Sequence, residues 1–297
     1  MKRFCCTLLF STLLVAPCLA QYRFKIVDFP GAAQTNVIAV NDGRQYVGIS
    51  VDAAGNDHAI YFNGKKISLL DPNGVVGANF SFALSLNNRG DIVGGYVDAA
   101  GVSHGFLYNG GKVSTLDFPG AASTQAFGVN DRREIIGIYF DSASNLHAFE
   151  LKNSTYKTID LSGALQTVPF SINDFSEIVG EDVDVAGTIG HGYLALKNGK
   201  FTMYDAPGAP PNSTFFISIN NLNKILGAWV DANNLNHNFL LTNGKSRIFD
   251  VPKSFKATQV SVQTLNDLSD VVGYFTDAQG IQHGFLAFRR ISGHSQQ

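Results

Sequence analysis

The chain contains little cysteine. Its 297 residues include three cysteines, all within the first 20 positions: Cys5, Cys6 and Cys18. Those 20 residues resemble an export signal, because a short basic start precedes an apolar run too short to span a bilayer, and the small Ala20 precedes Gln21. We expect a targeting segment over residues 1–20 with cleavage near Ala20, and hence a secreted or periplasmic protein. The exported chain would then contain no disulfide, no thiolate nucleophile and no cysteine-bound metal.

An excess of positive charge is also missing, and so are long hydrophobic runs beyond the targeting segment. The chain has 22 basic and 24 acidic residues, and Arg132-Arg133 is the one dense basic spot after that segment. This argues against nucleic-acid binding and against a polybasic membrane contact. No later stretch is apolar for about 18 residues, so we expect no membrane insertion after cleavage. The polar residues 291–297 are expected to form a disordered tail.

Histidine, by contrast, recurs at a nearly constant interval. Six of the seven histidines follow one another at steps of 43 to 46 residues, and each is preceded by an aspartate at a nearly constant distance. The pairs are Asp52 and His58, Asp98 and His104, Asp141 and His147, Asp184 and His191, Asp231 and His237, and Asp277 and His283. A fixed period of this length indicates stacked copies of one supersecondary unit.

Each copy predicts four short strands. In the second copy, alternating or apolar segments at 81–87, 91–98, 104–108 and 112–117 are separated by turn residues such as Asn109-Gly110. A turn asparagine recurs as Asn41, Asn87, Asn130, Asn173, Asn220 and Asn266. A strand glycine recurs as Gly48, Gly94, Gly137, Gly180, Gly227 and Gly273. Four antiparallel strands per unit of about 45 residues are typical of a β-propeller blade.

The sequence therefore predicts an all-β fold, a single six-bladed β-propeller over residues 21–290. The last copy lacks a fourth strand, and the segment at about 22–28 resembles a fourth strand without a blade of its own. We expect this N-terminal strand to complete the last blade and close the ring, because closure removes an exposed sheet edge. The predicted blades span 34–72, 80–118, 123–161, 166–206, 213–251 and 258–289.

Two strand patterns lead to more detailed expectations. In the third strand of each copy one equivalent position is large and apolar, which predicts a packed layer between blades. These residues are Ile60, Phe106, Phe149, Tyr193, Phe239 and Phe285. The first strand of the sixth copy aligns as two residues longer than the others, which predicts a β-bulge in that copy.

The copies resemble a known repeat. Ile-Val-Gly followed by Gly-x-x-His-Ala-Phe or Gly-x-x-His-Gly-Phe is similar to the HAF repeat of predicted extracellular bacterial proteins. In the third copy the matching residues are Asn130, Ile136, Gly137, His147, Ala148 and Phe149. The resemblance covers Phe24 to Phe288, but this chain has Tyr61, Tyr108 or aliphatic residues where the family often has tryptophan. The resemblance implies secretion and a repeat fold, and it implies no reaction, cofactor or substrate.

The Asp–His pairs are first of all structural candidates. Asp98 and His104 flank a hairpin and should lie within hydrogen-bonding distance, so that the aspartate holds the turn and the histidine tautomer. A metal site needs converging ligands, whereas six equivalent histidines are spread around a ring. A calcium loop needs six to eight oxygen ligands, and counterparts of the Asp52–Asp57 loop keep only the first aspartate. We therefore expect no metal and no cofactor, although catalysis by one privileged pair remains an alternative.

Function in a repeat protein is expected where the repeat is broken. The fourth copy has Glu181 and Asp182 at positions that are mostly apolar elsewhere, and its hairpin before His191 is one residue longer. In the third copy, Glu150 replaces a residue that is mostly leucine in the other copies. If the facing surfaces of blades 3 and 4 abut, Glu150 and Asp182 could meet and act as acid and base on a glycosidic bond, or hold a cation. The alternative is that blade 4 is merely wetter or locally irregular there.

Three functions follow as hypotheses. The first is a monomeric binding module for an extracellular glycan or a surface protein, with Asp184 and Trp229 as candidate binding residues. Trp229, the only tryptophan, could equally be part of the core. The alternative is a polysaccharide-active hydrolase or lyase using Glu150, Asp182, Glu181 and His191, and the third hypothesis is a structural envelope protein. The ligand face is expected at the end of the ring that carries both the Asp-Phe-Pro-Gly loops and the Asp–His hairpins.

Overall fold

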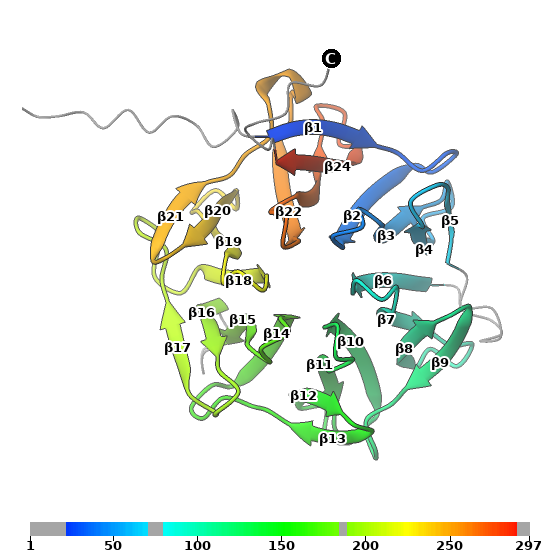
Figure 1. Cartoon of the computed structure of the whole chain (residues 1–297), viewed down its shortest axis with the longest axis vertical. Coiled ribbons are helices and arrows are strands. Elements are labelled where there is room, and N and C mark those ends of the chain that lie inside the picture. Colours follow the sequence, from blue (N-terminus) through cyan, green and yellow to red (C-terminus); the bar gives the residue numbers. More distant parts are fainter. Residues whose placement is uncertain (1–21, 71–79, 184–188, 290–297) are drawn as a thin grey trace, which may run out of the picture.

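The computed structural model describes residues 22–70, 80–183 and 189–289. Its strands form six four-stranded antiparallel sheets arranged radially around a central axis (Figure 1). The predicted six-bladed β-propeller is therefore confirmed. The predicted targeting segment, the C-terminal tail and Asp184 lie outside the described residues. Within the described part, no helix is long and apolar enough to cross a membrane.

The blades follow the chain in order, with the innermost strand first. Blade 1 consists of β2 (Gln34–Val40), β3 (Tyr46–Val51), β4 (Asp57–Phe62) and β5 (Ile67–Leu69). Blade 2 consists of β6 (Phe80–Leu86), β7 (Ile92–Val97), β8 (Ser103–Asn109) and β9 (Lys112–Leu116). Blade 3 consists of β10 (Ser123–Val129), β11 (Ile135–Phe140), β12 (Leu146–Lys152) and β13 (Thr155–Thr158). Blade 4 consists of β14 (Gln166–Ile172), β15 (Ile178–Val183), β16 (Ile189–Ala195) and β17 (Phe201–Tyr204). Blade 5 consists of β18 (Thr214–Ile219), β19 (Ile225–Val230), β20 (Asn236–Thr242) and β21 (Lys245–Ile248). Blade 6 consists of β22 (Gln259–Leu265), β23 (Val271–Thr276), β24 (Gln282–Arg289) and β1 (Tyr22–Val27).

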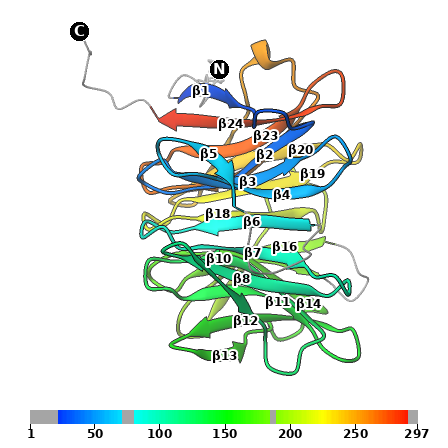
Figure 2. The same ribbon diagram turned by 90° about the vertical axis from the view of Figure 1, so that its right-hand side faces the viewer.

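The N-terminal strand closes the ring, as predicted. Strand β1 pairs with β24 along its whole length, from Tyr22 opposite Arg289 to Val27 opposite Gly284. Figure 2 shows β1 lying along β24 at one edge of the ring. Tyr22 is buried, and its ring meets that of Phe249 in blade 5 edge to face at 5.3 Å. The closing strand thus supplies both the missing ladder of hydrogen bonds and apolar contacts with the preceding blade.

The β-bulge predicted for the sixth copy is present, but every other innermost strand contains the same bulge, so it does not distinguish that copy. The register between the first and second strands shifts at the same position in all six blades, in blade 6 between Val262 and Thr264. All six strands are therefore equivalent in length up to the turn asparagine. The bulge also accounts for the repeated strand glycine. A Cβ on Gly94 would lie 1.9 Å from the carbonyl oxygen of Phe82, so a larger residue cannot fit.

The layer predicted between the blades is present. The six large residues of the third strands are all at most 4% exposed. Five of them, all except Ile60, belong to apolar clusters that join neighbouring blades. Phe149, for example, packs with Val93 and Leu116 of blade 2. Burial of apolar surface between blades, rather than any covalent link among the described residues, holds the ring together.

The turn asparagines form a closed ring of hydrogen bonds around the axis. Each side-chain Nδ2 donates to the backbone oxygen of the corresponding asparagine in the next blade, over 2.9–3.4 Å, and Asn266 donates back to Asn41. Each side-chain oxygen also accepts backbone N–H groups of its own turn, as Asn130 Oδ1 does from Arg132 and Glu134. All six asparagines are buried. The ring therefore couples the conformation of each turn to the position of its neighbour.

A second ring lies beside the first, one residue further along the chain. Each backbone N–H of this ring donates to a side-chain oxygen in the next blade, over 2.7–2.9 Å. Its members are Asp42, Asn88, Asp131, Asp174, Asn221 and Asp267. Together with one apolar residue from each innermost strand, the two rings line an open depression of only about 90 Å³ on the axis. The propeller is therefore tightly constricted at this end.

The asparagine ring can be tested with Asn130→Ala. This change removes bonds to Asn173 O and Glu134 and leaves buried backbone groups without partners. We expect a loss of about 2–4 kcal/mol in the free energy of unfolding, measured by urea denaturation. The exposed Lys112→Ala should change it by less than about 0.5 kcal/mol. Equal effects of the two substitutions would contradict a structural role for the ring.

Candidate functional site

The Asp–His hairpins share one geometry in the five blades in which both residues are described. One carboxylate oxygen accepts two backbone N–H groups of the turn, as Asp98 Oδ1 does from Ala100 and Val102 at 2.9 and 2.8 Å. The other oxygen faces the histidine Nε2, at 3.4 Å for His104. The remaining distances are 3.2 Å for Asp52–His58, 3.5 Å for Asp141–His147, 3.0 Å for Asp231–His237 and 3.4 Å for Asp277–His283. The aspartate thus fixes both the hairpin turn and the orientation of the histidine side chain.

A second carboxylate, which the sequence analysis did not identify, contacts histidine Nδ1 in four blades of the part of the chain that the structure describes. It is the aspartate that follows the outermost strand, so Asp117 Oδ1 lies 3.0 Å from Nδ1 of His104. The other pairs are Asp160–His147 at 2.7 Å, Asp205–His191 at 2.5 Å and Asp28–His283 at 2.9 Å. These contacts show that the loops and hairpins share one end of the ring. The repeated Asp before the loop was the available sequence signal.

These carboxylates change the protonation of the histidines. Partial burial opposes a charge on His104, but the hydrogen bonds and negative charges of Asp117 and Asp98 outweigh it and raise the His104 pKa. The hydrogen bond to Asp160 raises the pKa of His147. Among the described residues, no group of three or more potential ligands is arranged to hold a metal ion. The geometry is therefore that of a repeated clamp between the inner hairpin and the outermost strand.

Substitution of Asp117 tests the clamp. We expect Asp117→Asn to lower the His104 pKa towards its ordinary value of 6.5, because the larger of the two anionic interactions is removed. Histidine NMR titration measures this directly. Because the folded-state pKa is raised, the clamp stabilises the protein at low pH, and this stabilisation is lost as pH rises through the folded pKa. An unchanged His104 titration in the variant would contradict the clamp.

Trp229 takes part in the same layer of the fold. Its indole stacks on the His237 ring at 4.0 Å with an interplanar angle of 15°. Tyr96 and Tyr139 stack on His104 and His147 in the same way. Trp229 is half-buried and packs against the apolar cluster between blades 4 and 5. Its surroundings are those of a packing residue that covers a histidine.

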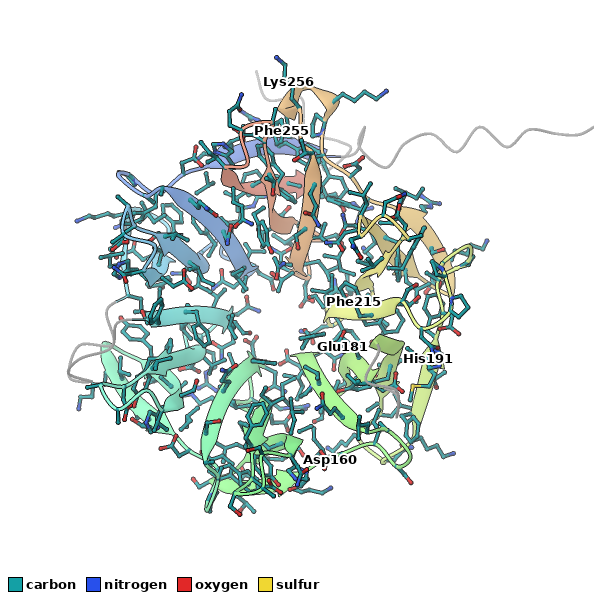
Figure 3. The ribbon with its side chains drawn as sticks, turned by 180° about the vertical axis from the view of Figure 1, so that it is seen from behind. Asp160, Glu181, His191, Phe215, Phe255 and Lys256 are labelled. Carbon is teal, nitrogen blue, oxygen red and sulfur yellow. The ribbon has the colours of Figure 1, made fainter. Side chains whose placement is uncertain are left out.

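Blade 4 departs from the pattern at two adjacent carboxylates. Asp182 is 7% exposed, and its Oδ1 accepts the backbone N–H of His191 at 2.5 Å. A Cβ on Gly190 would lie 2.5 Å from the same oxygen, so the glycine makes room for this carboxylate. Glu181 points to the opposite face of the strand. Figure 3 shows Glu181 nearer the axis of the ring than His191.

Burial raises the pKa of Glu181 to about 7, and the negative charge of Asp182 adds to this effect. Because the folded protein then binds more protons than the unfolded chain between pH 4.5 and about 7, the free energy of unfolding falls as pH rises through that window. The loss is at most about 3 kcal/mol.

Glu181→Gln should remove this pH dependence. We expect a higher melting temperature than wild type at pH 8 and little change at pH 4, because only the charged carboxylate is unfavourable when buried. Differential scanning calorimetry across pH 4–8 measures both. Glu150→Gln serves as the matched control for the loss of one carboxylate. If Glu181→Gln raised the melting temperature equally at pH 4 and pH 8, the raised pKa of Glu181 would be contradicted.

A groove of about 490 Å³ lies between blades 3 and 4. We call it the blade 3–4 groove. Its lining comes from the outer strands of blade 3 and the loop that follows them, and in blade 4 from the β14–β15 turn, the start of β15, β16, β17 and the turn between β16 and β17. The lining residues are Glu150, Lys152, Lys157, Thr158, Ile159, Asp160, Leu161, Ser162, Ser176, Ile178, Tyr193, Ala195, Leu196, Lys197, Gly199 and Phe201. Figure 3 places Asp160 near the outer rim of the ring.

A small residue at one strand position accounts for the groove. The third-strand residue opposite the start of the second strand is Phe62, Tyr108, Leu151 and Leu241 in blades 1, 2, 3 and 5. In blades 4 and 6 it is alanine: Ala195 lines the groove, whereas Ala287 belongs to an apolar cluster that also contains Tyr22 of the closing strand. Replacing a large side chain by a methyl group leaves space between packed blades. This substitution was visible in the sequence, but it signals a groove only once the two faces are known to abut.

The groove combines apolar, hydroxyl and charged groups. Tyr193 is 1% exposed, yet its hydroxyl has no hydrogen-bond partner among the described residues. Phe201, 39% exposed, offers an aromatic ring at the opening. Lys157 and Lys197 are exposed, and the Lys152 ammonium pairs with the buried Glu134. A half-enclosed space of this size with hydroxyl, carboxylate and ammonium groups suits a small polar ligand.

The carboxylates that the sequence suggested for catalysis or binding do not lie together in one site. Glu150 lines the blade 3–4 groove, opposite Lys157 in the sheet. Asp182 does not line it and instead anchors the backbone of His191. Glu181 faces away, and Asp184 lies outside the described residues. The groove therefore contains one of the four residues suggested for acid–base chemistry, together with Asp160 of the His147 clamp.

No family model and no curated protein matches the sequence. Solved structures do match the fold. A mutant of the Aleuria aurantia lectin in complex with Fucα1-6GlcNAc aligns with a TM-score of 0.55 at 14% identity, covering 88% of this chain and 94% of the lectin. AofleA from Arthrobotrys oligospora aligns with a TM-score of 0.56 at 14% identity, covering 90% of this chain and 86% of its own. The SapL1 lectin in complex with α-methyl fucoside aligns with a TM-score of 0.55 at 11% identity, covering 88% and 94%. At these identities the likeness establishes the fold alone.

Proposed function

We propose that this protein is a secreted glycan-binding module and that the blade 3–4 groove is its binding site. One observation carries the proposal. Tyr193, which lines this open space of about 490 Å³, has a buried hydroxyl without a hydrogen-bond partner among the described residues. A buried unpaired hydroxyl is costly, and a ligand hydroxyl could satisfy it.

The other lining groups suit a sugar. Phe201 offers a face for stacking against the apolar side of a pyranose ring. Glu150 can accept hydrogen bonds from sugar hydroxyls, while Lys157 and Lys197 can donate them. Structures with this fold include lectins bound to fucosides, which supports a glycan as the ligand class. An export signal and membership of the HAF-repeat proteins remain predictions that agree with an extracellular glycan.

A glycan array tests the proposal with Phe201→Ala. We expect binding to fall by about tenfold or more, because the stacking surface is lost. Phe80→Ala is the matched control, since Phe80 is also exposed, at 41%, and lies in another blade. Folding of both variants is checked by thermal unfolding. The proposal would be contradicted if the wild type bound no glycan on the array, or if Phe201→Ala and Phe80→Ala lost equal amounts of glycan binding.

A hydrolase remains the second candidate, on the strength of one observation. The pKa of Glu181 is raised to about 7, a value that suits a general acid. Glycoside hydrolysis requires a second carboxylate across the scissile bond, however, and the neighbouring Asp182 is committed to His191. Measuring new reducing ends in the same glycan incubations separates the two functions, because a binding module releases none.

A further inference from the structure

A second cavity, of about 310 Å³, lies between blades 5 and 6. Its lining residues are Tyr22, Lys224, Leu240, Thr242, Asn243, Lys245, Arg247, Ser269 and Arg289. Four of them are basic and none is acidic, although the chain as a whole has a formal net charge of −2. Positive charge is therefore concentrated at this cavity, which we call the blade 5–6 pocket.

The pocket results from a reversal of charge within the repeat. The residue four positions after the ring asparagine is acidic in four blades and neutral in one: Gln45, Asp91, Glu134, Glu177 and Asp270. Three of these carboxylates pair with a cation, as Asp91 does with Arg133 at 2.8 Å. Blade 5 has Lys224 instead, and its ammonium donates to the neutral Ser269 hydroxyl at 2.6 Å. A position that elsewhere holds an anion thus holds a cation here.

The remaining three cations come from two strands, β21 and β24. Lys245 and Arg247 lie two residues apart on β21, and therefore on one face of that strand. Arg289 ends β24 opposite Tyr22. Burial lowers the pKa of Lys224, and the positive charge of Arg289 lowers it further. An anion bound among these groups would relieve both the desolvation and the repulsion.

The carboxylate of Asp270, which contacts Arg289, does not neutralise the pocket. Asp270 accepts the backbone N–H of Arg289 at 2.8 Å, but its other oxygen accepts Nε of Arg44 in blade 1 at 2.9 Å. Asp270 is 1% exposed and does not line the pocket. Its charge is directed towards the neighbouring blade, so the guanidinium of Arg289 remains available to the pocket.

We propose that the blade 5–6 pocket binds an anionic substituent, a sulfate ester or a carboxylate, of an acidic polysaccharide. Guanidinium and ammonium groups bind both by charge-assisted hydrogen bonds, with guanidinium suited to two oxygens at once. That the anion is carried by a polysaccharide rests on the proposed glycan function. The anion site itself follows from the pocket alone. The two sites would lie two blades apart on one ring and could contact separate residues of one chain.

Titration of the full chain with dextran sulfate, polygalacturonate and neutral dextran tests this inference. We expect tight binding of at least one polyanion, with affinity falling as salt is added, and no comparable binding of dextran. Lys245→Gln and Arg247→Gln should each weaken polyanion binding by about tenfold. Lys112→Gln is the matched control, because Lys112 begins the fourth strand of blade 2 as Lys245 begins that of blade 5. The polyanion that binds more tightly identifies the sulfate or the carboxylate.

The outcomes are distinct. Equal losses in Lys245→Gln and Lys112→Gln would show only diffuse attraction to a polyanion and would overturn the pocket, as would failure of both polyanions to bind. Loss of glycan binding in Phe201→Ala with no polyanion binding leaves the proposed function standing and removes this inference. Polyanion binding that depends on Lys245 but not on Phe201 supports the pocket, even if the blade 3–4 groove binds no glycan.

Discussion

The ring of asparagine side chains is the constraint on which the rest of the molecule depends. Each asparagine uses its oxygen to close its own turn and its amide to hold the next blade, and the sixth returns to the first. A ring of this kind cannot close if one blade is displaced, so the turns enforce a common height and spacing. The apolar layers between blades supply most of the favourable burial, whereas the asparagines determine which arrangement the burial stabilises. Closure by β1 then completes the last sheet.

Because the scaffold is repeated, its differences are where function can be located. Ala195 in place of a large residue opens the blade 3–4 groove, and Lys224 in place of an acid makes the blade 5–6 pocket positive. Lys224 lies in the turn of Asn220, yet Asn220 still donates to Asn266 O in the next blade, and Ala195 lies outside both the asparagine turns and the Asp–His clamps. The propeller can therefore vary its inter-blade surfaces while its axis and its hairpin end stay the same.

Sequence reasoning was most reliable where the repeat itself carried the information. The period of the histidines predicted the number of blades, and the unpaired strand near Phe24 predicted how the ring closes. It failed where the decisive contact joins segments with no sequence pattern in common. The contact between His104 and Asp117 joins the paired strands β8 and β9 at their ends. The bulge shared by all six inner strands was assigned to one copy because a register shift is not visible in residue spacing. The candidate site was predicted least well, because Glu150 is the one suggested acid–base residue that lines the blade 3–4 groove.

By itself, then, the sequence determined the architecture: blade number, strand order, the closing strand and the buried layer of the third strands. These follow from local periodicity and from the need to bury one apolar face against the next. Only the tertiary structure decided which faces meet and what lies between them. The groove beside Tyr193 and the cluster of cations around Lys224 each depend on residues from two blades, and their chemistry exists only after those blades pack.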